Sequence, residues 1–165
     1  MPLAIFRIAT TRLVALAMGL AFAHVLERPA KLQYDAATYI ALQKSLYVQW
    51  GPPQLGGFLE PAAIAALALL AFLLRESRRD LWLTLAALLL MLLAFPVIFF
   101  WWVAPANAAF AATTLPAVPA DWTTLRSNWE TGHAIRFALQ FAALALLVGP
   151  LAFGSDARTG QDTNP

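Results

Sequence analysis

The chain contains no cysteine, and charged residues make up only 12% of its 165 residues. The missing cysteine excludes disulfides, thiolate metal sites and thiol redox chemistry within this chain. Soluble domains carry about 25% charged residues, so the low charge excludes an ordinary soluble domain. The chain has only two histidines, and neither an internal repeat nor a phosphate-binding glycine loop is present. Chemistry that needs titratable groups therefore has few residues to draw on.

What the chain has instead is hydrophobic residues, which make up 61% of the sequence and give a mean hydropathy of +0.66. Apolar runs are visible at about residues 13–26, 58–74, 81–103 and 134–153. A helix needs about 20 residues to cross the hydrocarbon core, so the last two runs suffice and the first two need flanking residues. The sequence therefore predicts an all-α, four-helix transmembrane bundle in one domain, residues 1–154. Residues 155–165 are small and polar, and we expect a disordered tail.

The first apolar run has a second interpretation. Arg7 and Arg12 precede or begin it, and an Ala-Phe-Ala sequence at residues 21–23 resembles the cleavage site of a signal peptide. Cleavage would leave His24 as the first residue. We favour an uncleaved helix, because the run continues past residue 23 and the other helices would otherwise lose a packing partner.

Positive charge predicts the orientation. The turn at residues 75–80 holds three arginines, and Arg7 and Arg12 lie near the N-terminus. By the positive-inside rule both segments are cytoplasmic, and the connections at residues 28–57 and 104–132 are external. We expect a bacterial inner-membrane protein, surrounded by lipid, with both termini in the cytoplasm. The pI near 9.4 then reflects topology, and without a basic stripe interleaved with aromatics it predicts no nucleic-acid partner.

A short helix is expected in the first external connection. Asp35 is a suitable N-cap, and the Gly-Pro-Pro sequence at residues 51–53 ends a helix near Trp50. Apolar residues recur there near helical spacing, which favours an amphipathic helix in the membrane interface or over the end of the bundle. A solvated connector with aromatic anchors is the alternative.

Both histidines lie three residues from a glutamate, His24 before Glu27 and His133 after Glu130. Residues three apart share one helix face, so each pair can point at one spot. Because successive spans alternate in direction, both pairs fall at the external end, where Glu60 also lies. Ionisable residues inside a membrane cost about 2.5–3.5 kcal/mol each at the centre, so they usually face the bundle interior. We therefore predict one polar site, with the imidazoles within about 8–10 Å of each other.

Further polar residues recur at helical spacing along the start of the last run. They are Arg126, Glu130, His133, Arg136 and Gln140. In a metal-free site His133 is the expected base and Glu130 its orienter. The groups expected to bind substrate or stabilise an anion are Arg126, Arg136, Asn107, Trp129 and Glu60. The site is thus predicted to use acid and base chemistry without a cofactor.

Other interpretations stay open. Glu-x-x-His is the ligand spacing of di-iron carboxylate proteins, so iron or another transition metal is the alternative to a cofactor-free site. Its ligands would be His24, Glu27, Glu60, Glu130 and His133. The two histidines are also the residues that would hold a haem. In a purely structural interpretation Ser127 and Glu130 form a capping box, Glu60 begins a helix before Pro61, and the tryptophans are interface anchors.

Four segments carry a resemblance to a family: His-Val-Leu-Glu-Arg-Pro at residues 24–29, Val-Ala-Pro-Ala-Asn at 103–107, Pro-Ala-Asp-Trp at 119–122 and Trp-Glu-x-Gly-His-x-x-Arg at 129–136. They resemble the anthrone oxygenase-like family, or domain of unknown function 1772, over nearly the whole chain. The resemblance implies a four-helix membrane protein. Characterised fungal members oxidise anthrones to anthraquinones with dioxygen, without a conventional organic cofactor, whereas most members have no assigned reaction.

By analogy of fold and motif, the resemblance implies an oxygenase-like oxidoreductase acting on a small lipophilic, aromatic molecule. The competing hypothesis is a non-catalytic membrane scaffold, or a protein that binds a lipid or a partner. The two differ in what the polar site needs. Catalysis needs an unblocked, reachable histidine, whereas a structural role needs every buried polar group to be paired. The sequence makes no prediction of oligomeric state.

Overall fold

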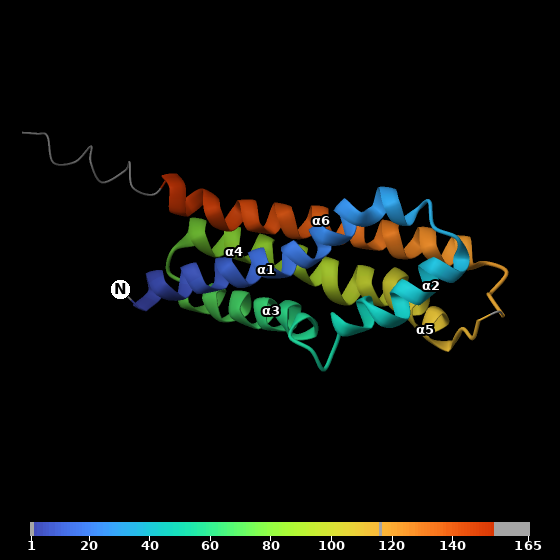
Figure 1. Ribbon diagram of the computed structural model, residues 1–165. Coiled ribbons are helices and arrows are strands. Elements are labelled where there is room, and N and C mark those ends of the chain that lie inside the picture. The colour runs from blue at the N-terminus through green and yellow to red at the C-terminus, as the bar shows by residue number, and fades with distance from the viewer. Residues whose placement is uncertain (1, 116, 154–165) are drawn as a thin grey trace, which may run out of the picture.

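The computed structural model describes residues 2–115 and 117–153, which form helices joined by short connections (Figure 1). In chain order they are α1 (Pro2–Lys31), α2 (Ala36–Ser45), the 3-10 turn η1 (Tyr47–Gln49), α3 (Gly56–Leu73), α4 (Arg78–Leu92), the π-helix η2 (Leu93–Val103), α5 (Ala104–Ala112) and α6 (Trp122–Phe153). The described residues contain no strand, so the predicted all-α fold is confirmed. The predicted disordered tail, residues 155–165, lies outside the described residues.

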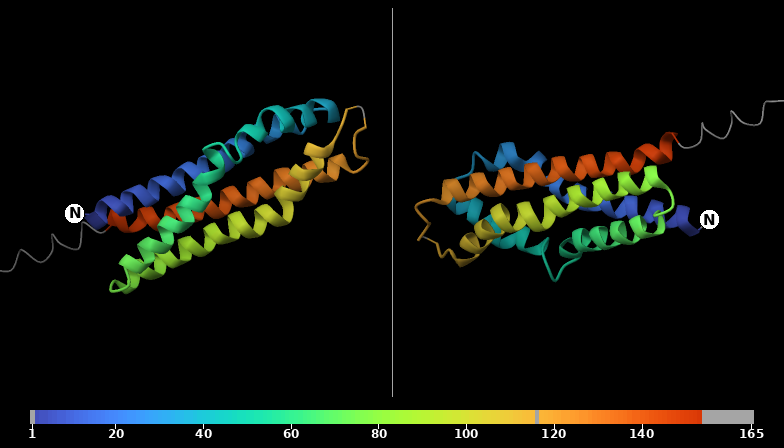
Figure 2. Two further views of the ribbon diagram at one scale, coloured as in Figure 1. Left: turned by 90° about the horizontal axis from the view of Figure 1, so that it is seen from below. Right: turned by 180° about the vertical axis from the view of Figure 1, so that it is seen from behind.

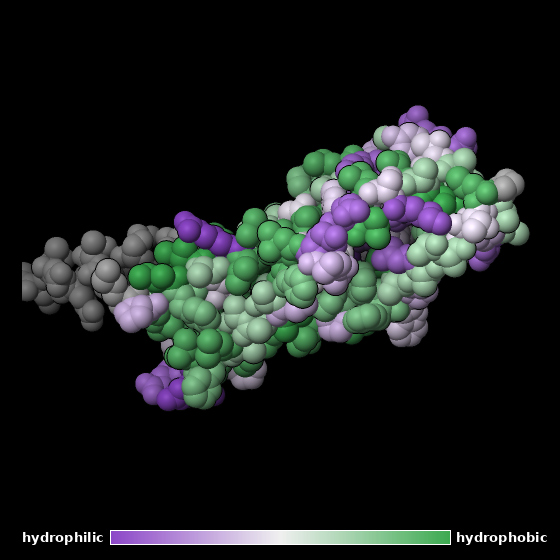
Figure 3. Space-filling model, turned by 60° about the horizontal axis from the view of Figure 1, so that its bottom comes forward, coloured by the Kyte–Doolittle hydropathy of each residue, from purple (hydrophilic) through white to green (hydrophobic). Residues whose placement is uncertain are grey.

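Four helical stretches are long and apolar enough to cross a membrane: Pro2–Lys31, Gly56–Leu73, Arg78–Ala112 and Trp122–Gly149. The chain is therefore a multi-pass membrane protein. Large apolar side chains on outward faces, such as Phe72 and Phe141, are 61% and 57% exposed and contact lipid. Much of the surface in Figure 3 is hydrophobic accordingly. The helices extend beyond the predicted apolar runs, because their polar flanks keep their backbone hydrogen bonds and still pack on neighbours.

The long helices close a ring: α1 packs on α6 and α3, α3 packs on α4, and α4 with η2 packs back on α6 (Figures 1 and 2). At the α3–α4 turn the interior is apolar and filled. Its buried residues are Val14, Ala17, Ala63, Leu67, Ala87, Met91, Ala143 and Leu147. Arg7 Nη2 lies 2.6 Å from Asp80 Oδ2 and ties α1 to α4 at this end. The filled half leaves the other end of the bundle as the place for polar residues.

At that other end, α2 and η1 lie over the bundle. Asp35 caps α2 as predicted, since its side chain accepts a hydrogen bond from the Thr38 amide at 2.8 Å. This bond holds the pKa of the Asp35 carboxyl below its usual value. The helix is shorter than predicted and ends at Ser45. The tighter η1 turn then brings Tyr47 toward α1, where its hydroxyl donates to Glu27 Oε2 at 2.6 Å.

The third membrane stretch changes pitch in its middle, where η2 takes the wide π-helical form. Pro96, which has no backbone N–H, lies near the start of η2, and such widened turns accommodate a proline within a helix. The stretch then continues to Ala112, past the end of the predicted apolar run at residue 103. Helix α6 approaches η2 closely at Gly132, where a β-carbon would lie 2.8 Å from Cγ2 of Val103. Packing therefore explains the glycine of the Trp-Glu-x-Gly-His motif.

Candidate functional site

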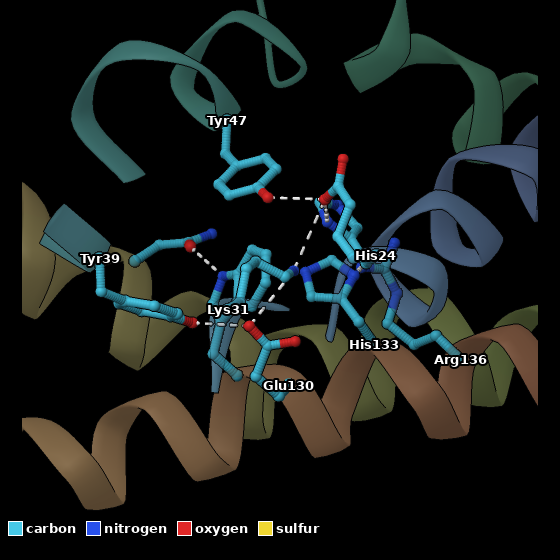
Figure 4. A network of polar contacts seen from close by, with 10 residues as sticks. His24, Lys31, Tyr39, Tyr47, Glu130, His133 and Arg136 are labelled. Carbon is cyan, nitrogen blue, oxygen red and sulfur yellow. Dashed lines mark hydrogen bonds and ion pairs between the residues drawn. The ribbon is translucent and has the colours of Figure 1, made fainter. Parts of the chain in front are cut away.

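The polar residues gather around the two imidazoles at the end covered by α2 (Figure 4). His24 of α1 and His133 of α6 lie with ring centroids 4.0 Å apart, which confirms their predicted proximity. The Trp129 ring contacts both, at centroid distances of 4.7 and 4.2 Å. The histidines are only 5% and 6% exposed. They form one buried site.

The imidazoles line a cavity of about 500 Å³. Ligand sites usually measure about 300–1,000 Å³, so a small organic molecule fits. Much of the wall is aromatic, and the aromatic residues are Tyr47, Trp50, Phe95, Phe99, Phe100, Phe110 and Trp129. The polar residues of the wall include His24, Gln43, Glu60, Asn107, His133 and Arg136. Such a wall suits a lipophilic ligand that carries a polar group.

Arg136 determines where His133 carries its proton. Arg136 Nη1 lies 3.1 Å from His133 Nδ1, and a guanidinium has donors only. Nδ1 must therefore be the acceptor, and the neutral ring carries its proton on Nε2. Arg136 Nη2 also donates to Glu60 Oε2 at 2.5 Å, and Gln140 donates to the other oxygen of Glu60. In this tautomer the remaining ring nitrogen of His133 is a hydrogen-bond donor, which disfavours its predicted role as the base.

Glu130 does not orient His133, contrary to the prediction. Its Oε1 accepts a hydrogen bond from the Tyr39 hydroxyl at 3.0 Å and lies 3.2 Å from Lys31 Nζ. The physical reason is that the Glu130 carboxylate is only 1% exposed and requires a nearby cation. Lys31 of α1 supplies this cation, whereas the neutral imidazole of His133 carries no charge. The capping-box interpretation is also wrong, because Ser127 lies inside α6.

Lys31 is the residue that the sequence prediction missed. It is 2% exposed, and its ammonium lies between two carboxylates, 3.7 Å from Glu27 and 3.2 Å from Glu130 (Figure 4). The same ammonium lies 4.5 Å from the Trp129 ring centroid, a cation–π contact. The sequence contained a signal for it, because Lys31 follows His24 by seven residues and Glu27 by four, on the same helix face.

Two tyrosines join the network from the α2–η1 segment. Tyr39 donates to Glu130, and Tyr47 donates to Glu27. Burial raises the pKa of both phenols far above the usual value, and the neighbouring carboxylates raise it further. Both hydroxyls therefore stay protonated and remain donors throughout the physiological pH range. In the sequence, both tyrosines are among the apolar residues that recur near helical spacing in this connection.

Most predicted site residues reach the site, and Arg126 is the exception. Its Nη1 donates to the backbone carbonyls of Leu32 and Tyr34, both at 3.2 Å, so the carbonyls that follow α1 bind this guanidinium and its predicted anion-binding role is wrong. Glu60 lies inside α3 rather than at its first residue, and it faces Arg136. The remaining predicted residues of the cavity wall are His24, Asn107, Trp129 and His133.

Asn107 and Trp129 act together. Asn107 Oδ1 accepts a hydrogen bond from the Trp129 indole nitrogen at 2.7 Å, which orients the ring against both histidines. Trp129 is 1% exposed and is therefore no interface anchor, whereas Trp101 is 75% exposed, as expected of one. The asparagine thus helps to position one wall of the cavity.

No family model, curated protein or solved structure matches this chain. The activity must therefore be argued from the residues of the site. Their geometry limits which cofactors fit between them.

Two of the five residues expected as metal ligands are bound by cations. Glu60 is bound by Arg136, and Glu130 by Lys31. Within residues 2–115 and 117–153, no three histidine, aspartate or glutamate side chains form a group that could hold a metal ion. The imidazoles of His24 and His133 are in contact, which leaves no space for a porphyrin between them.

Proposed function

We propose that this protein is a membrane oxygenase that uses dioxygen to oxidise a small lipophilic aromatic molecule, without a metal or an organic cofactor. The observation that carries the proposal is the pair of buried imidazoles at one side of an aromatic cavity of about 500 Å³. A base and an anion-stabilising group next to an apolar ring site are what proton removal from a weak carbon acid needs. The Trp-Glu-x-Gly-His-x-x-Arg motif supports the anthrone oxygenase-like reaction class.

In this proposal His24 is the base. Its Nδ1 is buried, finds no hydrogen-bond partner among the described residues, and lies 3.8 Å from Glu27 Oε2. Glu27 stabilises the imidazolium that forms, and its 36% exposed side chain connects it to solvent. His133 Nε2–H and Arg136 stabilise the oxyanion of the substrate. The proposal thus moves the base from His133 to His24, because Arg136 occupies the acceptor nitrogen of His133.

The reaction balances with dioxygen as the oxidant. His24 removes a proton from the ring CH₂ of an anthrone-like substrate, and the electron pair moves to the carbonyl oxygen to give an enolate. Dioxygen takes one electron from the enolate and then joins the ring carbon as a peroxide, which the imidazolium protonates. Removal of the second C–H proton breaks the O–O bond and releases water. The sum is CH₂ plus O₂ giving C=O plus H₂O.

A scaffold requires that buried polar groups be paired. Several buried polar atoms have no hydrogen-bond partner among the described residues, and those of cavity residues belong to His24, Gln43 and Arg136. A purely structural site would have these groups paired, so their unpaired state favours a binding or catalytic role for the residues that carry them.

The proposal is tested by oxygen uptake of the purified protein in lipid nanodiscs with anthrone as substrate. We expect anthraquinone to form at one dioxygen per product. The rate should exceed the spontaneous rate by about 10²–10⁴-fold, the usual contribution of a positioned base. A chelator should not change this rate, because the proposed reaction uses no metal. Nanodiscs without protein correct for spontaneous oxidation. A rate no higher than this control, across anthrone and other lipophilic phenols, removes the enzymatic proposal, and loss of activity on chelation removes its cofactor-free part.

We further propose that the site lies at the external end, with both termini in the cytoplasm of a bacterium. The chain has no cysteine, so the exposed Ser45 and Ser77 can each be replaced with cysteine on a clean background. An impermeant thiol reagent is expected to label Ser45→Cys in intact cells, and Ser77→Cys only after permeabilisation. The opposite pattern reverses the orientation.

A further inference from the structure

The exposed residues of the cavity wall belong to the α2–η1 segment and to the η2–α5 segment, so the cavity opens on one side of the bundle, between these segments. Its wall includes residues from both segments that are also exposed on the outer surface, such as Val48 at 54% and Phe100 at 59%. A wall residue that reaches the surface marks where a cavity meets the exterior. The exposed wall residues on the two rims include Lys44, Val48, Pro52, Phe100 and Ala111.

The end of the bundle, in contrast, is closed. Tyr39 and Ile40 of α2 pack on Phe110 and Trp129, and all of these side chains are 0–1% exposed. A ligand cannot pass this cluster without unpacking α2. The side opening is therefore the shorter route into the cavity.

The rim residues place the opening at the membrane boundary. Trp101, next to Phe100, is 75% exposed, and Val97 one turn below is 44% exposed. Exposed aromatic side chains collect at the headgroup level, and a lysine such as Lys44 brings its charge to the same level. Figure 3 shows polar residues gathered among hydrophobic ones toward the end that carries α2 and α5. The opening thus faces lipid headgroups.

One hydrogen bond crosses this opening. Lys44 Nζ on the α2 side donates to the backbone carbonyl of Thr113, just after α5, at 2.6 Å. The bond is only partly buried, and breaking it disturbs no packed side chain of the Tyr39 and Phe110 cluster. It can open while the helices stay in place.

We infer that the ligand enters sideways from the headgroup region of the bilayer, through the opening between η1 and α5, and that the Lys44–Thr113 bond is a latch across this opening. The ligand class that fits is a flat, multi-ring amphiphile dissolved in the membrane. The inference rests on the proposed function only for the identity of the ligand, because access to the cavity can be measured without turnover.

The test places one cysteine inside the cavity. Gln43 lines it and is 8% exposed, whereas Thr10 is 0% exposed on α1 and outside it, so Thr10→Cys is the matched buried control. In proteoliposomes, N-(1-pyrenyl)maleimide partitions into the bilayer, and a sulfonated stilbene maleimide stays in water. We expect the pyrenyl reagent to modify Gln43→Cys about tenfold faster than Thr10→Cys, because the control reacts only through local unfolding. Ala21→Cys, also in the cavity wall and 2% exposed, repeats the comparison if Gln43→Cys fails to fold.

The sulfonated reagent is expected to react with Gln43→Cys far more slowly than with the exposed Ser45→Cys. Adding Lys44→Met should raise the pyrenyl rate about three- to tenfold, the range of one net hydrogen bond, whereas Lys44→Arg keeps a donor and the parent rate. Equal pyrenyl rates at both buried positions overturn the opening. Rapid sulfonated labelling at Gln43→Cys overturns the sideways route, and an unchanged rate in Lys44→Met overturns the latch. If the cysteine variants are labelled as expected but the parent protein takes up no oxygen, the proposed oxygenase function is wrong and the sideways entry route still stands.

Discussion

Replacing His24 with glutamine is expected to lower the oxygen-dependent turnover number by about 10²–10⁴-fold, the usual contribution of a positioned base. Glutamine keeps a polar side chain of similar reach but has no titratable nitrogen. The Nδ1 of His24 has no hydrogen-bond partner among the described residues, so the exchange breaks no bond that holds the fold. Thermal unfolding of the purified variant should therefore stay near that of the parent while oxygen uptake is lost.

His133→Gln is the matched comparison, because it lies at the same site and keeps an N–H donor. It should lose much less turnover, about tenfold, since a donor toward the oxyanion remains. If the turnover number falls more in His133→Gln than in His24→Gln, the base is His133 and not His24. If both variants unfold readily and the parent takes up no oxygen, the imidazoles hold the helices together and are not catalytic.

The sequence predicted where the site would form but not which side chains of the site would form hydrogen bonds and ion pairs with each other. Hydropathy gave the spans, and the three-residue spacing with alternating direction was enough to bring His24 and His133 together. The predicted pairing of Glu130 with His133 was wrong because spacing along one helix reveals only neighbours on that helix. In the folded chain the strongest partner of a buried carboxylate is a cation from another helix, as Lys31 is for Glu130.

The cavity itself could not be predicted from the sequence. Its volume depends on how the rings of η2 pack, and η2 is a π-helix whose pitch the apolar run at residues 81–103 does not reveal. The helix α2 itself was predicted because Asp35 is a recognisable cap, and a position over the bundle was one of the alternatives that the sequence left open. The role of Tyr39 was not foreseen, since an aromatic residue at helical spacing predicts packing before it predicts a hydrogen bond.

Arg136→Met is expected to destabilise the protein by about 3–5 kcal/mol, because it leaves the Glu60 carboxylate buried without its cation. The side chains of this pair are 8% and 9% exposed, and only Gln140 would still donate to Glu60. Methionine keeps the length and apolar bulk of the arginine stem, so the loss reports charge and hydrogen bonding more than packing. Denaturation of the purified protein in mixed micelles measures it.

The pair Arg7–Asp80 at the other end of the bundle is the matched control. Its side chains are 25% and 22% exposed, so water screens the charge that Arg7→Met leaves behind, and the expected loss is about 0–1 kcal/mol. Adding Glu60→Gln to Arg136→Met removes the stranded charge and should restore most of the lost stability. Equal losses of stability for the two arginine variants, or no recovery in the double variant, would mean that water reaches Glu60 and that the Arg136–Glu60 pair is not a desolvated ion pair.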